Sequence, residues 1–96
     1  MTGTTLSSDG LDVRRRRLLY RCWHRGTREM DLIMGRFADT ALPAMSDEDL
    51  EAFERLSDCR DDDLYAWVTG ERPVPADHDT ALFRSLRDFQ FRTVER

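Results

Sequence analysis

The chain has 96 residues, of which 40% are hydrophobic and 35% are charged, and its formal net charge is −4. This length suits one domain with a single hydrophobic core, which excludes a second core or a deep substrate cavity. No apolar stretch approaches the roughly 18–20 residues that span a membrane, and residues 1–11 lack the pattern of a secretory signal. We therefore expect a small cytoplasmic protein without a membrane span, which acts through its surface.

Charge is distributed unevenly along the sequence. Residues 1–28 contain seven arginines and two acidic residues, a net charge of +5. Residues 47–79 contain twelve acidic residues and three arginines, a net charge of −9. Such separation indicates surfaces of opposite sign, or a partner that recognises one of them. Every basic residue is an arginine, whose planar guanidinium suits paired hydrogen bonds with carboxylates.

The first expected helix covers residues 9–25. Gly26 follows it, at a position where helices commonly take a left-handed residue. Residues 1–10 are expected to be a flexible N-terminus, so that the helical domain covers residues 11–96. The helix carries an apolar stripe beside its arginines, formed by Leu11, Leu18, Leu19, Cys22 and Trp23.

The second expected helix, over residues 27–41, has the clearest periodicity in the chain. Its apolar residues recur every three or four positions and therefore share one helical face. They are Met30, Ile33, Met34, Phe37, Ala38 and Ala41. Pro43 lies shortly afterwards and cannot continue a helix. We expect this face, including Ile33, to be buried.

Three more helices are expected after Pro43. The third follows the N-cap Ser46 and has acidic residues 47–49 in its first turn, where the helix dipole favours negative charge. The fourth is capped by one of residues 61–63 and ended by Gly70, and the fifth covers residues 76–94. Their inward-facing residues are expected to be Leu50, Phe53, Leu56, Leu64, Trp67, Val68, Leu82, Leu86 and Phe89. No segment alternates like a strand, so the predicted fold is all-α, a small bundle of five helices in a single domain.

Catalytic and metal sites are not indicated. His24 and His78 are far apart in the sequence, and no Gly-rich phosphate loop is present. Residues 61–63 are acidic but lack the alternating spacing and central glycine of a calcium loop. Cys22 and Cys59 do not form a C-x-x-C pair, and we expect both to be unpaired, small, buried apolar residues. The expectation is a protein with no enzyme activity and no bound metal.

The four arginines at residues 14–17 raise the question of nucleic-acid binding. Four consecutive residues of a helix point in four directions, so the run by itself does not form one basic face. The protein as a whole is acidic, with a pI of about 5.1. We expect no nucleic-acid partner, and a small basic-helix nucleic-acid-binding or regulatory module stays as the alternative function, ahead of an unrelated adaptor domain.

The segment Arg25-Gly26-Thr27-Arg28-Glu29 has two interpretations. In one, it is a junction between helices in which Gly26 supplies the turn and Glu29 benefits from the dipole of the next helix. In the other, it is a docking surface, because a glycine lets a partner's backbone approach closely while Arg25 and Arg28 bind carboxylates. The residue types are compatible with both.

The stretch Arg14–Ala38 resembles the succinate dehydrogenase flavinylation factor family, whose signature R-G-x-x-E matches Arg25, Gly26 and Glu29. A second family block resembles L-x-x-F-E-x-L at residues 50–56, followed by D-x-D-L-Y-x-W at residues 61–67. The two blocks together cover about residues 14–75 at the expected spacing.

Two departures from the family pattern lie outside the signature. Ser57 stands where the family usually has a leucine, and Asp62 where a proline is frequent. Within the second block, Trp67 falls on the apolar face of its helix and is expected to be buried. Tyr65 points elsewhere and is the better surface candidate.

The resemblance implies a five-helix bundle that binds the flavoprotein subunit of succinate dehydrogenase, and of fumarate reductase where present. It implies that binding promotes covalent attachment of FAD to a histidine of that subunit, as a chaperone does, while the bond-forming chemistry belongs to the flavin and the client. FAD is then the cofactor of the client, and no cofactor is tightly bound to this chain, which we expect to be a monomer. The residues expected to bind the partner are Arg17, Arg25, Gly26, Arg28, Glu29 and Tyr65.

Overall fold

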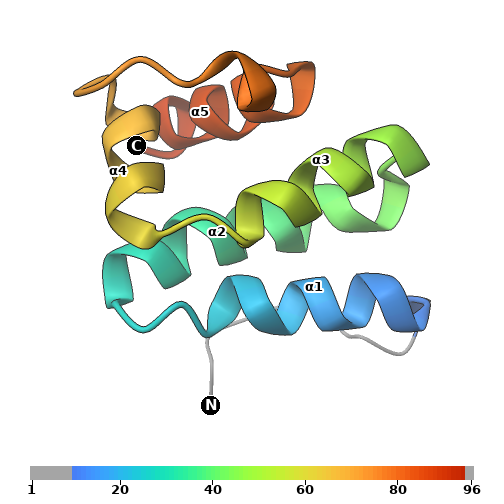
Figure 1. The fold of residues 1–96 in the computed structure, drawn as a ribbon. Helices are drawn as coiled ribbons and strands as arrows, with labels where there is room; N and C mark the ends of the chain where they lie inside the picture. The colour runs from blue at the N-terminus through green and yellow to red at the C-terminus, as the bar shows by residue number, and fades with distance from the viewer. Residues whose placement is uncertain (1–9, 95–96) are drawn as a thin grey trace. The chain divides into compact units, whose positions relative to one another are not determined.

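The computed structural model describes residues 10–94. It contains five α-helices and two 3-10 turns: α1 (Val13–Trp23), α2 (Arg28–Ala41), η2 (Leu42–Ala44), α3 (Asp47–Ser57), α4 (Asp61–Thr69), η3 (Ala76–His78) and α5 (Ala81–Val94) (Figure 1). No strand occurs within this range, so the all-α prediction with five helices is confirmed. The chain divides into two compact units, the first ending at Ser46 and the second beginning at Asp47. The expected flexible segment 1–10 lies outside the described residues except for Gly10.

Helix α1 is shorter than predicted at both ends. Its N-cap is Asp12, whose Oδ1 accepts a hydrogen bond from the backbone N–H of Arg15 at 2.8 Å. This bond and the positive charge of Arg15 hold the pKa of the Asp12 carboxyl below its usual value. At the other end, His24 has left the helical conformation and its N–H bonds to the carbonyl of Arg21. The helix therefore ends at Trp23, and Gly26 lies in the turn that follows.

Helices α1 and α2 meet closely at Gly35. A Cβ atom on this residue would overlap the indole ring of Trp23. The indole is buried, and its Nε1–H donates to Asp39 Oδ1 of α2 at 3.1 Å. Because glycine has no side chain beyond hydrogen, Gly35 leaves room for the indole of Trp23, which holds the end of α1 against α2.

We expect Gly35→Ala to destabilise the protein although alanine favours helix more than glycine does. The gain in helix propensity is about 1 kcal/mol, whereas forcing an extra carbon into a packed core costs typically about 1–3 kcal/mol. Thermal unfolding measures the difference, with Gly35→Ala made both in the native background and in Trp23→Leu. The loss should shrink in the Trp23→Leu background. Equal losses in both would show that the indole is not the obstacle.

The apolar face of α2 is buried with two exceptions. Met30, Met34, Phe37 and Ala38 are buried as predicted. Ala41, the last residue of the helix, is half-buried, so the prediction of its burial is wrong. Ile33 is also only half-buried, so the prediction of its full burial is wrong. The physical reason is its place at the edge of the apolar stripe, where the helix surface turns toward solvent.

Arg15 ties α1 to the segment after α2. Its Nε donates to the carbonyl of Leu42 at 3.0 Å, and its Nη2 donates to the carbonyl of Met45. Its Nη1 also pairs with Asp12 at 2.9 Å. One of the four consecutive arginines is thus used to hold the first unit together.

In the second unit, α3 begins directly after Ser46 with its three acidic residues in the first turn, as predicted. Helix α4 begins at Asp61, because Arg60 is extended and its carbonyl accepts the N–H of Leu64. The prediction that one of residues 61–63 caps α4 is therefore wrong: all three lie inside its first turn, where they favour the helix through its dipole. Gly70 ends α4 with a φ of 84°, as predicted.

Helix α5 begins five residues later than predicted. Residues 76–78 form the separate turn η3, and the helix starts at Ala81. Thr80 explains the start, because its Oγ1 accepts the backbone N–H of Phe83 at 3.1 Å and so acts as a cap. Thr80 is itself the sequence signal for this start, because threonine is a common N-cap residue, and hydrophobic periodicity does not detect it.

The core of the second unit contains the residues predicted from periodicity. The buried ones are Leu50, Phe53, Leu56, Leu64, Trp67, Val68, Leu82 and Leu86, together with Phe83. Phe89 is half-buried. Ser57 is also buried, and its hydroxyl donates to the carbonyl of Glu54 at 2.7 Å, so this departure from the family pattern leaves no unsatisfied polar atom.

Both cysteines are free, as expected. Cys22 is fully buried, and burial raises the pKa of its thiol to about 12, so it is an uncharged apolar residue at neutral pH. Cys59 is only half-buried, so the prediction of its burial is wrong, and its Sγ lies 3.5 Å from Nε2 of His78.

Candidate docking site

The turn between α1 and α2 carries the signature residues. Gly26 has a φ of 112°, a backbone conformation that residues with a side chain rarely adopt. A Cβ placed on it would meet no atom within 4 Å. The two interpretations of the segment are therefore compatible, since Gly26 is required for the turn and also presents open backbone at the surface.

The turn is fixed by hydrogen bonds from the start of α2. Thr27 is the N-cap, and its Oγ1 accepts the backbone N–H of Met30 at 3.2 Å. Asp31 reaches back and accepts the backbone N–H of Arg25 at 2.6 Å. These bonds hold the backbone around Gly26 in one conformation before any partner arrives, which lowers the entropy cost of docking.

The charged side chains of the signature differ in their burial. Arg28 and Glu29 are exposed, whereas Arg25 is half-buried. Within residues 10–94, neither Arg28 nor Glu29 has a side-chain hydrogen bond or ion pair. Two charges of opposite sign therefore follow the open glycine at the start of α2, and both are available to a partner.

An open hollow of about 610 Å³ lies beside Gly26. Its lining residues are Trp23, His24, Gly26, Thr27, Arg28, Asp31 and Leu32. The lining combines apolar carbon with charges of both signs, and a wide mouth leaves it in contact with water. Such a surface suits the side chains of a protein partner better than an enclosed small-molecule site.

Arg17 lies on the same side of α1 as the hollow. It is exposed, has no side-chain polar partner among the residues described, and precedes His24 by seven positions, close to two helical turns. The structure thus places five of the six predicted docking residues in the first unit: Arg25 and Gly26 in the turn, Arg28 and Glu29 at the start of α2, and Arg17 on α1.

Two residues of this region were missed by the sequence analysis. The rings of Tyr20 and His24 are stacked, with centroids 3.8 Å apart and planes 14° apart. His24 Nδ1 also lies 2.7 Å from the carbonyl of Tyr20. Their spacing of four residues, which places side chains side by side on a helix, was the available signal.

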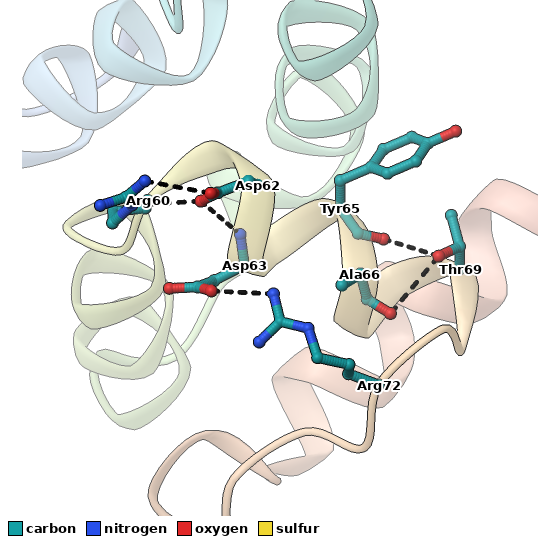
Figure 2. A network of polar contacts seen from close by, with 7 residues as sticks. All are labelled: Arg60, Asp62, Asp63, Tyr65, Ala66, Thr69 and Arg72. Carbon is teal, nitrogen blue, oxygen red and sulfur yellow. Dashed lines mark hydrogen bonds and ion pairs between the residues drawn. The ribbon is translucent and has the colours of Figure 1, made fainter.

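Tyr65 belongs to the second unit. It is 39% exposed, as predicted, while Trp67 is buried against the ring of His78. Figure 2 shows the phenol ring of Tyr65 directed away from the polar contacts of its own helix, and only its carbonyl is engaged, by the hydroxyl of Thr69 at 2.8 Å. A side chain held this way is free to contact a partner.

The acidic residues beside Tyr65 are paired with arginines (Figure 2). Asp62 accepts two hydrogen bonds from Arg60 at 3.2 and 3.0 Å, and this pairing keeps the pKa of the Asp62 carboxyl below its usual value. Asp63 pairs with Arg72 at 2.9 Å. In the part of the chain that the structure describes, no group of three or more His, Cys, Asp or Glu side chains is arranged to hold a metal ion.

Comparison with known proteins gives one family and many relatives. Residues 16–90 match the family model Sdh5, described as the flavinator of succinate dehydrogenase. The chain is 35% identical over 81 residues to the FAD assembly factor SdhE of Acetobacter pasteurianus, covering 84% of this chain and 74% of that protein. It is 35% identical over 83 residues to the mitochondrial succinate dehydrogenase assembly factor 2-B of Drosophila ananassae. It is 46% identical over 57 residues to the mitochondrial succinate dehydrogenase assembly factor 2 of Komagataella phaffii.

The match covers different shares of these proteins. The chain spans 51% of the Drosophila protein and 30% of the Komagataella protein, against 84% and 59% of its own length. All five residues of the signature segment lie inside the matched range 16–90, as do Arg17 and Tyr65. None of the helices in the described part is long and apolar enough to cross a membrane.

Proposed function

The chain belongs to the family described as the flavinator of succinate dehydrogenase, and we propose that it binds the flavoprotein subunit of that enzyme and promotes covalent attachment of FAD to it. The proposal extends to the flavoprotein of fumarate reductase where this is present. Binding is proposed to stabilise the client in a conformation in which its own residues and the flavin form the bond. We propose that the factor is a monomer, acts in the cytoplasm and has no reaction of its own.

One observation carries this proposal, the exposed turn at Gly26. Its backbone is fixed by Thr27 and Asp31, its surface is open, and Arg28 and Glu29 carry charges that nothing in the described structure neutralises. A rigid turn with unpaired charges and an adjoining hollow has the properties of a protein-docking site.

Binding to the purified flavoprotein subunit tests the proposal. Isothermal titration calorimetry should show one factor bound per flavoprotein, and Glu29→Ala should weaken the complex by roughly the worth of one charge-assisted pair, about tenfold. Glu29 has no internal partner to lose, so its variant should keep the native circular dichroism spectrum. Absence of any heat of binding with the wild-type factor, for a flavoprotein shown to be folded, would contradict the proposal.

The colour of the purified factor tests the assignment of FAD to the client. We expect the purified protein to be colourless, without the visible absorbance band of flavin, and to contain no bound metal. The protein is precipitated with acid, and the absorbance spectrum of the supernatant shows whether flavin was bound. Elemental analysis of the purified protein shows whether metal was bound. Flavin that co-purifies in near-stoichiometric amount would overturn the proposal that this chain acts without a cofactor.

A further inference from the structure

Helix α1 has an exposed stripe that the signature does not include. It consists of Val13, Arg17, Tyr20, Arg21 and His24, and we call it the α1 stripe. Each of these positions lies three or four residues from at least one other (13 and 17, 17 and 20, 17 and 21, 20 and 24, 21 and 24), so they share one broad face of the helix. All five are exposed, with Val13 at 51% and Tyr20 at 62%.

Two residues of the α1 stripe, Val13 and Tyr20, are large hydrophobic residues that are more than half exposed. Single exposed apolar residues are common, but Tyr20 and Val13 lie on the same face with His24 stacked on the tyrosine. The nearly parallel rings, whose centroids lie 3.8 Å apart, form a flat platform. Rigid aromatic groups of this kind bury large areas at protein interfaces at low entropy cost.

The stripe is also positively charged. The sequence of α1 contains five arginines and no acidic residue. Arg15 is turned inward to the carbonyls of Leu42 and Met45, whereas Arg17 is exposed and has no polar partner for its side chain in residues 10–94. Charge complementarity therefore calls for carboxylates on whatever covers this face.

His24 makes the stripe continuous with the turn. Its ring stacks on Tyr20, and the same residue lines the hollow beside Gly26 and Arg28. A partner seated on the turn would extend along α1 without a break in the contact surface. The two features therefore lie on one side of the first unit.

We propose that the α1 stripe is the second half of the docking surface and that it takes an acidic segment of the client flavoprotein. Carboxylates of that segment pair with Arg17, and its apolar side chains cover the Tyr20–His24 platform. This inference rests on the proposed function, because it assigns the occupant to the same client. The arginines would also attract a nucleic acid, but its charged backbone would not cover the exposed apolar side chain of Val13 at the far end of the stripe.

The test measures the dissociation constant of factor and purified flavoprotein subunit as a function of salt. Arg17→Glu should weaken binding at least about tenfold at low salt and flatten the salt dependence, because a carboxylate then faces carboxylates. Tyr20→Ser should weaken binding by about tenfold while leaving the salt dependence unchanged. Arg36→Glu is the matched control, since Arg36 is exposed on α2 and its side chain has no polar partner in the described range. It should bind like wild type.

The outcomes separate this inference from the proposed function. If wild type binds, Gly26→Arg does not, and both stripe variants bind like wild type, the stripe inference is overturned and the proposed function stands. If wild-type factor fails to bind the flavoprotein at all, both are overturned. A stripe that binds a 20-base-pair DNA duplex, with Arg17→Glu losing the DNA and keeping the flavoprotein, would also overturn the inference.

Discussion

Gly26→Arg is expected to leave the factor folded and to abolish flavinylation of its client. A Cβ at this position meets no atom within 4 Å, so the new side chain enters solvent and not the core. The left-handed backbone adds a strain of about 1–2 kcal/mol, which a domain of ordinary stability tolerates. The arginine would hold a partner's backbone several ångströms away from the turn, and contacts with Arg28 and Glu29 would be lost with it. Circular dichroism reports folding, and in-gel flavin fluorescence of the co-expressed client reports flavinylation.

Gly70→Arg is the matched control for this variant. Gly70 also has a positive φ, 84°, and open space around its Cβ position, so the substitution introduces the same bulk, charge and kind of strain. It lies at the end of α4, outside the signature, and flavinylation should proceed normally. If Gly26→Arg unfolds the protein while Gly70→Arg does not, the turn is chiefly structural and the docking assignment loses its support. Normal flavinylation with folded Gly26→Arg would show the assignment to be wrong.

Phe53→Ala is expected to have the largest effect on stability. Phe53 is fully buried in the second unit, and truncating such a ring removes its transfer free energy and leaves a cavity, a loss of about 3–5 kcal/mol. The free energy of unfolding of a small domain is only about 5–15 kcal/mol, so the substitution would remove much of the stability. Urea unfolding followed by circular dichroism gives the free energy of unfolding directly.

Phe91→Ala provides the comparison for this loss. The chemical change is identical, but the side chain of Phe91 is 59% exposed on α5, and the free energy of unfolding should change by less than about 0.5–1 kcal/mol. Similar losses for the two variants would mean that Phe53 is not a core residue in solution. The difference between them isolates burial from helix propensity, because both positions are helical.

Periodicity predicted the helices and most of the core correctly, because burial of one face is what fixes an amphipathic helix. Met30, Met34 and Phe37 on α2, and Phe53 on α3, are buried as expected. The errors occur where a local hydrogen bond decides the outcome. Thr80 starts α5 after a separate 3-10 turn, and Arg60 precedes the three acidic residues that were expected to cap α4.

The residues of the site were predicted from a sequence motif, but the motif did not predict their geometry. The sequence indicated that Gly26 would follow α1, and Thr27 is a common N-cap residue, but the bond from Asp31 back to the N–H of Arg25 has no sequence signature. The Tyr20–His24 platform was missed because an exposed aromatic residue looks like one more surface residue until its neighbour is placed beside it. That Arg15 and Arg16 of the run bind backbone carbonyls within the fold also became clear only from the structure.

The rate of covalent FAD attachment to the purified, unflavinylated flavoprotein subunit is the most direct measure of the central claim. Flavoprotein and free FAD are mixed with and without the factor, and covalent flavin is followed over time by fluorescence after denaturing electrophoresis. We expect wild-type factor to increase the rate in proportion to its concentration until the client is saturated, and Gly26→Arg to give the rate without factor. Equal rates with and without wild-type factor, for a client that becomes flavinylated in cells only when the factor is present, would contradict the claim.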